Sequence, residues 1–228
     1  MGAEDLASLR QSVVEAANFL VRSGALSLSN HGNFSVRVPG TDTVLLTGTS
    51  SLVNLRPENL ALLDLEGRLV DGEINPTNAE IVHMHTVVYK HRPQAGAVVH
   101  THSPYCTAWA IASRPIECAY EALVRSEMTD GVPVARYGPR GSAMAIANIA
   151  AALGGTAETR AVLLENHGLL AWGGDAALAA RTVLTVEEAA QMGLHAEALG
   201  GSKLIPPELR RATLERRDEF AQAGSQRT

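Results

Sequence analysis

A His-x-His pair follows a short apolar segment near the middle of the chain. His100 and His102 come directly after Ala97-Val98-Val99, which has the composition of a buried β-strand. Side chains two residues apart on a strand point to the same side of the sheet, so both imidazoles should reach the same cation. Imidazole nitrogens bind zinc and other divalent transition metals. The spacing therefore predicts two ligands of a metal site.

His167 is the strongest candidate for a third ligand. It lies in the segment Leu163–Gly168, where another short apolar run meets a histidine at a glycine turn. Metal sites recruit ligands from separate parts of a chain, and catalytic sites leave a position open for water or substrate. We therefore predict that His100, His102 and His167 hold one divalent ion that can act as a Lewis acid.

A second His-x-His motif, His83-Met84-His85, has the same spacing in a different setting. Residues 78–92 have the periodicity of a helix, in which residues two apart point to nearly opposite faces. We therefore predict that this pair does not chelate and that its histidines are structural or only support residues of the site. The remaining histidines are interpreted as loop or helix-surface residues: His31, His91 and His195.

Two carboxylates compete for the role of proton carrier. Glu80 follows Thr77 by three residues, so the two fit a capping box in which Glu80 bonds back to the start of a helix. The functional alternative aims Glu80 at a metal-bound substrate, as an acid/base whose burial favours its protonated form. Glu165 precedes His167 by two residues and would share its side of an extended segment, where it could orient that ligand.

Short polar loops offer a site for an anion without lysine. Backbone amides, hydroxyls and helix N-termini bind anions, although the same residue types are also ordinary turn formers. Both interpretations apply to three loops around one expected helix start, which contain Asn30, Gly32, Asn33, Thr47, Gly48, Thr49, Ser50, Thr77 and Asn78.

The helices and strands that must position these residues alternate along the chain. Besides the strand before His100, apolar runs predict strands at 34–38, 44–47, 60–65, 68–70, 133–137, 161–165 and 169–172. Helical spacing predicts helices at 5–22, 78–92, 104–112, 142–153 and 176–199, and a charged, initially helical tail after Pro206-Pro207. No repeat, linker or composition break divides them. We predict one α/β domain over residues 1–228, with a peripheral tail at 203–228.

Composition limits the partners and the compartment. The chain has 228 residues, of which 46% are hydrophobic, and a formal net charge of −5 without clusters of Lys or Arg. This balance argues against nucleic acid and anionic membranes as partners. Cys106 and Cys118 form no metal or redox motif, and the chain has neither a secretory pattern nor an apolar run long enough to span a bilayer. We therefore expect a cytoplasmic protein.

Several segments, taken in order, resemble the class II aldolase/adducin family. The resemblance covers about residues 6–199. It is carried by Gly32-Asn33-Phe34-Ser35-Val36-Arg37, Leu46-Thr47-Gly48-Thr49-Ser50, Pro76-Thr77-Asn78-Ala79-Glu80, Met84-His85, Arg92-Pro93, Val98-Val99-His100-Thr101-His102-Ser103 and Leu163–Gly168. The family implies a three-layer α/β/α fold around a central, mainly antiparallel sheet. It also implies a homotetramer with sites between subunits.

The resemblance gives roles to the candidate residues. His100, His102 and His167 would hold one divalent metal per subunit, typically zinc, with manganese, cobalt and iron as alternatives. Glu80 would be the catalytic acid/base. The substrate phosphate would be bound by Gly32, Asn33, Thr49, Ser50, Thr77 and Asn78.

Two departures separate this chain from the fuculose-1-phosphate aldolases of the family. The stretch from Glu80 to the central His-x-His is one residue longer, which a shifted helix start would absorb. The tail 203–228 contains no tyrosine, whereas those enzymes carry one there that serves the neighbouring subunit's site. Tyr120 or Tyr137 would have to supply a hydroxyl instead.

These features predict a metal-dependent lyase that cleaves a ketose 1-phosphate to dihydroxyacetone phosphate and an aldehyde. The missing tyrosine shifts the expected substrate from fuculose 1-phosphate toward 5-deoxy- or 5-methylthioribulose 1-phosphate. An epimerase, a dehydratase or a decarboxylase would use the same metal and stays open. A non-catalytic, adducin-like binding module is the alternative of another class, and the three histidines argue against it.

Overall fold

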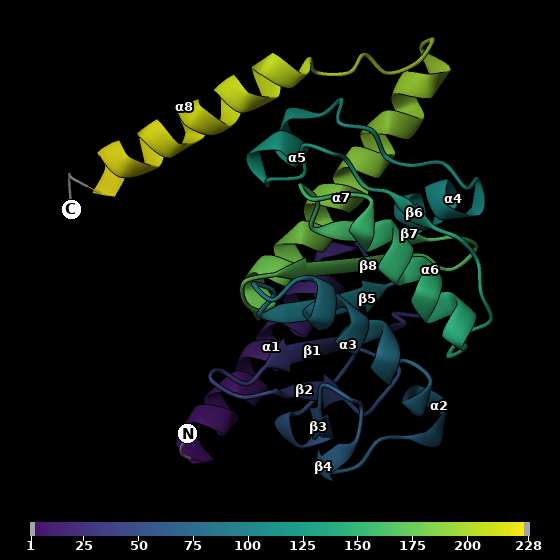
Figure 1. The fold of residues 1–228 in the computed structure, drawn as a ribbon, viewed down its shortest axis with the longest axis vertical. Coiled ribbons are helices and arrows are strands. Elements are labelled where there is room, and N and C mark those ends of the chain that lie inside the picture. Colours follow the sequence, from purple (N-terminus) through teal and green to yellow (C-terminus); the bar gives the residue numbers. More distant parts are fainter. Residues whose placement is uncertain (1–2, 226–228) are drawn as a thin grey trace.

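The computed structural model describes residues 3–225 as an eight-stranded sheet with helices on both faces (Figure 1). The strand order is β4-β3-β2-β1-β5-β8-β7-β6. All neighbouring strands are antiparallel except the pair β6 and β7. The predicted α/β fold with a mainly antiparallel sheet is confirmed.

The strands are β1 (Gly32–Arg37), β2 (Thr43–Thr47), β3 (Leu60–Asp64), β4 (Leu69–Asp71), β5 (Ala97–Thr101), β6 (Val134–Ala135), β7 (Ala161–Leu164) and β8 (Gly168–Gly173). The helices are α1 (Ala3–Ser23), α2 (Pro76–Ala79), α3 (Val82–His91), α4 (Pro104–Ile111), α5 (Glu121–Arg125), α6 (Ala143–Gly154), α7 (Ala176–Ala198) and α8 (Pro207–Ser225), with a short 3-10 turn at Pro57–Asn59. Among these described helices, none combines the length and hydropathy that a bilayer crossing requires.

Each face of the sheet is covered by its own helices. Phe34, Val36 and Val99 point to one face and pack with apolar residues of α1, α4 and α7. Val98 points to the opposite face and packs with apolar residues of α3 and α6. Because strand side chains alternate, His100 lies on the same face as Val98, under α3. The central strand β5 is buried along its whole length, so it holds the histidine rigidly.

The helix expected at 78–92 is broken into two. Its parts, α2 and α3, are separated by a turn at residues 80–81. The amide of Ile81 donates to the Asn78 carbonyl (3.1 Å) three residues back, so the regular α-helical ladder is interrupted there. Glu80 therefore lies in a turn between two helices and not within one continuous helix.

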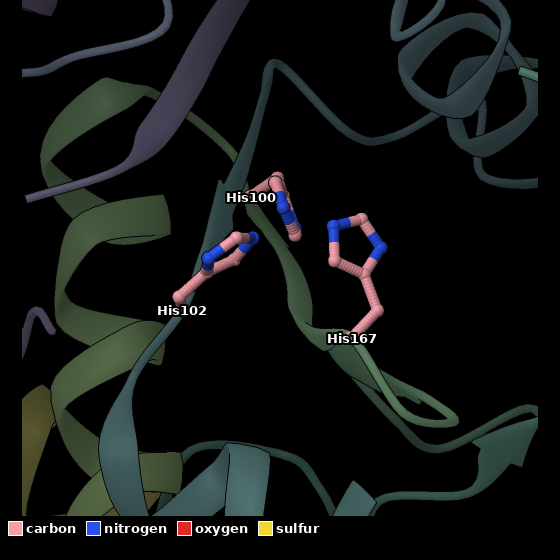
Figure 2. A group of neighbouring side chains, drawn as sticks. All are labelled: His100, His102 and His167. Carbon is pink, nitrogen blue, oxygen red and sulfur yellow. The ribbon is translucent and has the colours of Figure 1, made fainter. Parts of the chain in front are cut away.

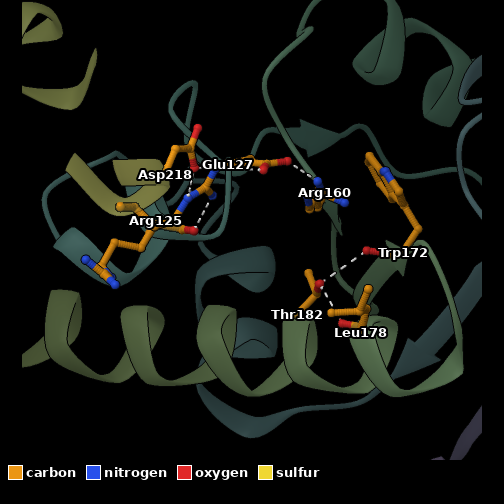
Figure 3. Close-up of polar contacts among 8 residues, drawn as sticks. Arg125, Glu127, Arg160, Trp172, Leu178, Thr182 and Asp218 are labelled. Atoms are coloured by element: carbon orange, nitrogen blue, oxygen red, sulfur yellow. Dashed lines mark hydrogen bonds and ion pairs between the residues drawn. The ribbon is translucent and has the colours of Figure 1, made fainter. Parts of the chain in front are cut away.

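The tail forms a helix that extends beyond the edge of the sheet on the side of α5 (Figure 1). It is attached by Arg217, which donates to the Arg125 carbonyl (2.8 Å) and pairs with Glu127 (3.1 Å) (Figure 3). A second cation, Arg160, pairs with the same Glu127 carboxylate. Helix α8 runs from Pro207 to Ser225, so the tail is helical beyond the initial segment that the sequence predicts.

Candidate metal centre and active site

Three histidine side chains from two distant segments meet at one end of the sheet. His100 lies in β5, His102 directly follows it, and His167 lies in the turn between β7 and β8, with all three rings facing a common space (Figure 2). The ring centroids are 4.6 Å apart for His100 and His167 and 5.0 Å apart for each other pair. One nitrogen of each ring lies within 4.8 Å of a nitrogen of both other rings. The group predicted from the sequence is therefore assembled and could hold a metal ion.

A tight turn brings His167 to the pair on β5. The His167 amide donates to the Leu164 carbonyl (2.9 Å), and Asn166 has a φ of 57°, a left-handed conformation that asparagine tolerates. Gly168 then allows the close approach of the two strands. A Cβ at this position would lie 2.5 Å from the Thr101 carbonyl oxygen. A side chain at residue 168 would therefore push the turn away from the site.

The electrostatic environment keeps the three imidazoles neutral. Burial, followed by the neighbouring His167 and His102 rings, holds the pKa of His100 well below its usual value. Burial, with smaller effects of His31 and Arg140, lowers the pKa of His102. Burial, His102 and Arg140 lower the pKa of His167 to about 4. Neutral imidazole is the form that binds a metal ion, so the site is ready for one at pH 7.

A backbone hydrogen bond gives His100 the tautomer that a metal ligand requires. His100 Nδ1–H donates to the Leu169 carbonyl (2.8 Å). Because a carbonyl oxygen only accepts, this hydrogen bond fixes the tautomer and leaves the lone pair on Nε2. Three neutral nitrogens with one tautomer fixed by the backbone fit a zinc-type ion with positions to spare.

The three polar loops are joined to one another by backbone hydrogen bonds. The Gly32 amide donates to the Ser50 carbonyl (3.2 Å), and the Asn75 amide donates to the Gly48 carbonyl (3.2 Å). Asn78 is fully buried, and neither polar atom of its side chain has a hydrogen-bond partner among the described residues. A buried amide without partners is costly, so Asn78 is an unusual feature of these loops.

Not every polar residue of these loops is free to meet a ligand. The Thr47 hydroxyl accepts a hydrogen bond from the Phe34 amide (3.0 Å) and joins two strands. The Thr49 hydroxyl donates to the Ser51 carbonyl (3.2 Å) within its own turn. Ser50 is exposed, and Asn33 is buried directly across from His100 in the pairing of β1 with β5.

Glu80 is exposed, so the burial expected for it is wrong in the single chain. Half of its side chain (53%) is accessible, and its Oε2 lies 3.3 Å from Nε of Arg140. The turn at residues 80–81 is the physical reason, because it places Glu80 against the loop that contains Arg140. Gly141 permits this contact, since a Cβ there would lie 3.0 Å from the Glu80 Cβ. The capping-box interpretation is wrong about the N-cap, because α2 begins at Pro76 and its first helical hydrogen bond goes to the Asn75 carbonyl, which leaves Thr77 inside the helix.

Glu165 lies in the turn rather than in the extended segment expected for it, although it lines the same pocket as His167. Its carboxylate accepts hydrogen bonds from the Ser113 hydroxyl and from the Tyr137 amide (2.6 Å). The first bond, then the second, lowers the pKa of Glu165. The residue is therefore held as a carboxylate that joins three loops.

A pocket adjoins His167 on the side of α6. Its polar lining includes Glu80, Tyr137, Arg140 and Glu165, together with His167. Its apolar lining consists of Ile81, Met84, Ala135, Ala145, Ile146, Ile149 and Leu164. Tyr137 thus lines the same pocket as His167, whereas Tyr120 lies at the start of α5, where the Glu188 carboxylate raises its pKa.

Comparison with known proteins agrees with this geometry. Residues 11–194 match the family described as Class II Aldolase and Adducin N-terminal domain. The chain belongs to this family. Its similar relatives are named as aldolases, which are lyases, so the chain is an enzyme of the lyase class.

Individual relatives cover most of the class II aldolase chain. A 5-deoxy-D-ribulose 1-phosphate aldolase of Bacillus thuringiensis is 31% identical over 199 residues, which are 86% of this chain and 89% of the relative. A 3-oxo-tetronate 4-phosphate decarboxylase of Haemophilus influenzae is 31% identical over 196 residues, 82% of this chain and 87% of the relative. The solved structure of an L-fuculose 1-phosphate aldolase has a TM-score of 0.81 at 26% identity and covers 95% of this chain and 97% of its own.

Two features of the site escape the sequence analysis. Arg140 is not among the predicted site residues, yet its charge acts on both His102 and His167. The second is a buried chain of hydrogen bonds between β1 and α3. The signal for that chain is a polar stripe, Asn33, Ser35 and Arg37, on one side of a strand whose other side is apolar.

Proposed function

We propose that this class II aldolase cleaves a ketose 1-phosphate, in a metal-dependent reaction, to dihydroxyacetone phosphate and an aldehyde. The observation that carries the proposal is the meeting of His100, His102 and His167, with ligand atoms within 4.8 Å of one another. The metal is zinc, one ion per subunit, with manganese, cobalt or iron as substitutes. When bound, such an ion supplies a Lewis acid for the charge that develops next to the substrate carbonyl.

The substrate phosphate binds in the polar loops of Gly32, Asn33, Thr49, Ser50, Thr77 and Asn78. Two observations support this site: the loops are joined through the Gly32 and Ser50 backbones, and the buried Asn78 amide lacks partners among the described residues. Uncharged donors of this kind bind phosphate through several hydrogen bonds. They also fix the distance from the phosphate to the reacting carbon, which lowers the entropic part of the barrier.

Glu80 acts as the acid/base that moves a proton at the carbon next to the carbonyl. It lines the same pocket as His167, where its carboxylate pairs with Arg140 (3.3 Å), whereas Glu165 accepts hydrogen bonds from Ser113 and Tyr137. Its exposure in the single chain fits a homotetramer in which a neighbouring subunit covers this side of the pocket. A general acid/base contributes about 10²–10⁴-fold to a rate.

The far end of the substrate is apolar, as in 5-deoxy- or 5-methylthioribulose 1-phosphate. The pocket beside His167 has a largely apolar wall, including Met84, Ile146 and Ile149. The tail carries no tyrosine hydroxyl for a sugar hydroxyl. A relative named 5-deoxy-D-ribulose 1-phosphate aldolase supports the same choice.

A decarboxylase that uses the same histidines is the second candidate. The named 3-oxo-tetronate 4-phosphate decarboxylase is as similar in identity as the aldolase relative. Both reactions leave negative charge beside a carbonyl, so the histidines alone do not separate them.

One experiment tests both candidates. The zinc-loaded protein is incubated with 5-deoxyribulose, 5-methylthioribulose and fuculose 1-phosphates and with 3-oxo-tetronate 4-phosphate, and products are identified by mass spectrometry. Dihydroxyacetone phosphate from the 5-substituted ribulose phosphates is the expected result, and carbon dioxide from the oxo acid alone would favour the decarboxylase.

A matched pair of variants then tests the acid/base. Glu80→Gln should lower kcat by about 10²-fold or more, whereas Glu165→Gln should retain most activity. The reverse order would assign the proton transfer to Glu165.

A further inference from the structure

A chain of four buried side chains connects helix α3 with the strand β1. The Tyr89 hydroxyl lies 2.9 Å from Ser35 Oγ, which lies 2.7 Å from His85 Nδ1. His85 Nε2 in turn lies 2.6 Å from Asn33 Oδ1. All four residues are at most 5% exposed. The chain therefore runs from the helix to a residue of the proposed phosphate loops without contact with bulk water.

The Tyr89 hydroxyl determines which atom donates and which accepts in each of these hydrogen bonds. Among the described residues, Ser35 Oγ is the acceptor available to the Tyr89 hydroxyl, so the Tyr89 proton goes there. Burial raises the pKa of Tyr89, which keeps that proton in place. The Ser35 hydroxyl must then donate its own proton to His85 Nδ1.

The remaining bond is then determined as well. Burial lowers the pKa of His85 to about 3, so the ring is neutral and carries one proton. Because Nδ1 accepts from Ser35, the proton lies on Nε2 and is donated to Asn33. The atom that receives it must be the carboxamide oxygen, since the nitrogen is a donor. The Asn33 nitrogen is consequently turned away from the helix.

The position of Asn33 explains why the orientation of its side-chain carboxamide matters. It follows Gly32, whose amide bonds to Ser50 in the neighbouring loop, and it pairs across the sheet with His100. Its nitrogen takes part in no hydrogen bond within residues 3–225. Two N–H groups are thus available at the boundary between the histidine cluster and the polar loops.

We propose that Tyr89, Ser35 and His85 are positioning residues that hold the Asn33 carboxamide with its N–H groups toward the substrate phosphate. The inference rests on the proposed function for the identity of the anion. The fixed direction of the hydrogen bonds matters because a carboxamide can rotate by half a turn, which exchanges its oxygen and nitrogen, at little steric cost. The rotated form would present an oxygen to the phosphate and would repel it.

The first test needs no substrate. In protein labelled with ¹⁵N at histidine, a long-range ¹H–¹⁵N spectrum should show His85 as the neutral Nε2–H tautomer. In Tyr89→Phe the source of the direction is removed, so the Nδ1–H tautomer should gain population. An Nδ1–H tautomer in the unmodified protein would overturn the proposal.

The second test measures anion binding. Inorganic phosphate is titrated into the zinc-loaded full chain by calorimetry. His85→Leu should weaken binding by about 10-fold or more, because a hydrogen bond to a charged group is lost. Tyr89→Phe should weaken it by a smaller, measurable factor. Equal binding in all three proteins would refute a positioning role.

A matched control separates positioning from general loss of stability. Thr182→Val removes a buried hydroxyl that bonds to the Trp172 and Leu178 carbonyls on the other face of the sheet (Figure 3). It should leave phosphate binding unchanged. If it weakens binding as much as His85→Leu does, the effect is structural and the proposal fails.

Kinetics distinguish this inference from the proposed function. With a cleaved ketose 1-phosphate, the His85 and Tyr89 variants should raise KM more than they lower kcat. Weaker phosphate binding without any cleavage by the unmodified protein would reject the aldolase substrate and keep the positioning role. Cleavage with unchanged KM in His85→Leu would reject the positioning role and keep the substrate.

Discussion

The two His-x-His pairs of this chain have the same spacing and lie on adjacent elements, yet they differ in what they do. His100 and His102 leave the end of a buried strand and meet His167. His83 and His85 lie on helix α3, where the first is exposed and the second is fully buried. The backbone conformation therefore decides whether two imidazoles converge or diverge.

The neighbours of each ring complete the difference. His100 uses one nitrogen for the Leu169 carbonyl and keeps the other free. Both nitrogens of His85 are occupied, by Ser35 and Asn33. A ring with both nitrogens bonded has no lone pair for a cation, so His85 acts on side chains instead.

The largest effect is expected from removing a histidine of the metal-site pair, His100 and His102. His100→Ala should weaken metal binding by more than about 100-fold, because loss of even a supporting partner costs 10–100-fold. Metal content after dialysis, measured by atomic absorption, checks this. His195→Ala, on the exposed side of α7, is the control that should keep its metal. Retention of a full equivalent by His100→Ala would move the site elsewhere.

A substitution in the histidine pair on helix α3 should change the stability of the fold and not metal binding. His85→Gln should lower the free energy of unfolding by about 1–3 kcal/mol, since it leaves a buried partner unsatisfied. Its metal content should equal that of the unmodified protein. Urea denaturation of the metal-free protein measures the first and dialysis the second. Loss of metal in this variant would mean that the two pairs are not independent.

The pH dependence of stability sharpens the same distinction. The pKa of His85 is about 3 in the folded protein and 6.5 as its ordinary value, so between these pH values the unfolded chain binds a proton that the folded chain does not. Stability should therefore fall as the pH decreases through this window, by at most about 1.4 kcal/mol per pH unit for this residue. His85→Gln removes that contribution. Identical slopes for this variant and the unmodified metal-free protein would contradict the assignment.

The smallest effect is expected at the exposed member of the helix pair. His83→Gln should change the free energy of unfolding by less than about 0.5 kcal/mol, as is usual for surface substitutions. Metal content and phosphate binding should also stay constant. A large change in either would show that His83 is more than a surface residue.

The sequence predicts that His100 and His102 point to the same side, because the alternation of side chains along β5 is a local property. It also predicts His167, whose turn has its own local signal in Asn166-His167-Gly168. The exposure of Glu80 could not be predicted, since it depends on a helix break at residues 80–81 and on the approach of Gly141. The chain from Tyr89 to Asn33 requires a helix stripe with spacing four to dock on a strand stripe with spacing two. Periodicity reveals each stripe but not their contact.

The turn at Asn166 has one more consequence. The hydrogen bond from His100 to Leu169 joins residues 69 positions apart, and an ion shared by His100, His102 and His167 would close the same long loop a second time. Any ion that prefers the folded chain raises the temperature of unfolding, by the equivalent of about 2.7 kcal/mol at a concentration 100 times its dissociation constant. Melting curves recorded with zinc, manganese, cobalt and iron would therefore rank the four ions by their affinity for the folded chain before a single turnover has been observed.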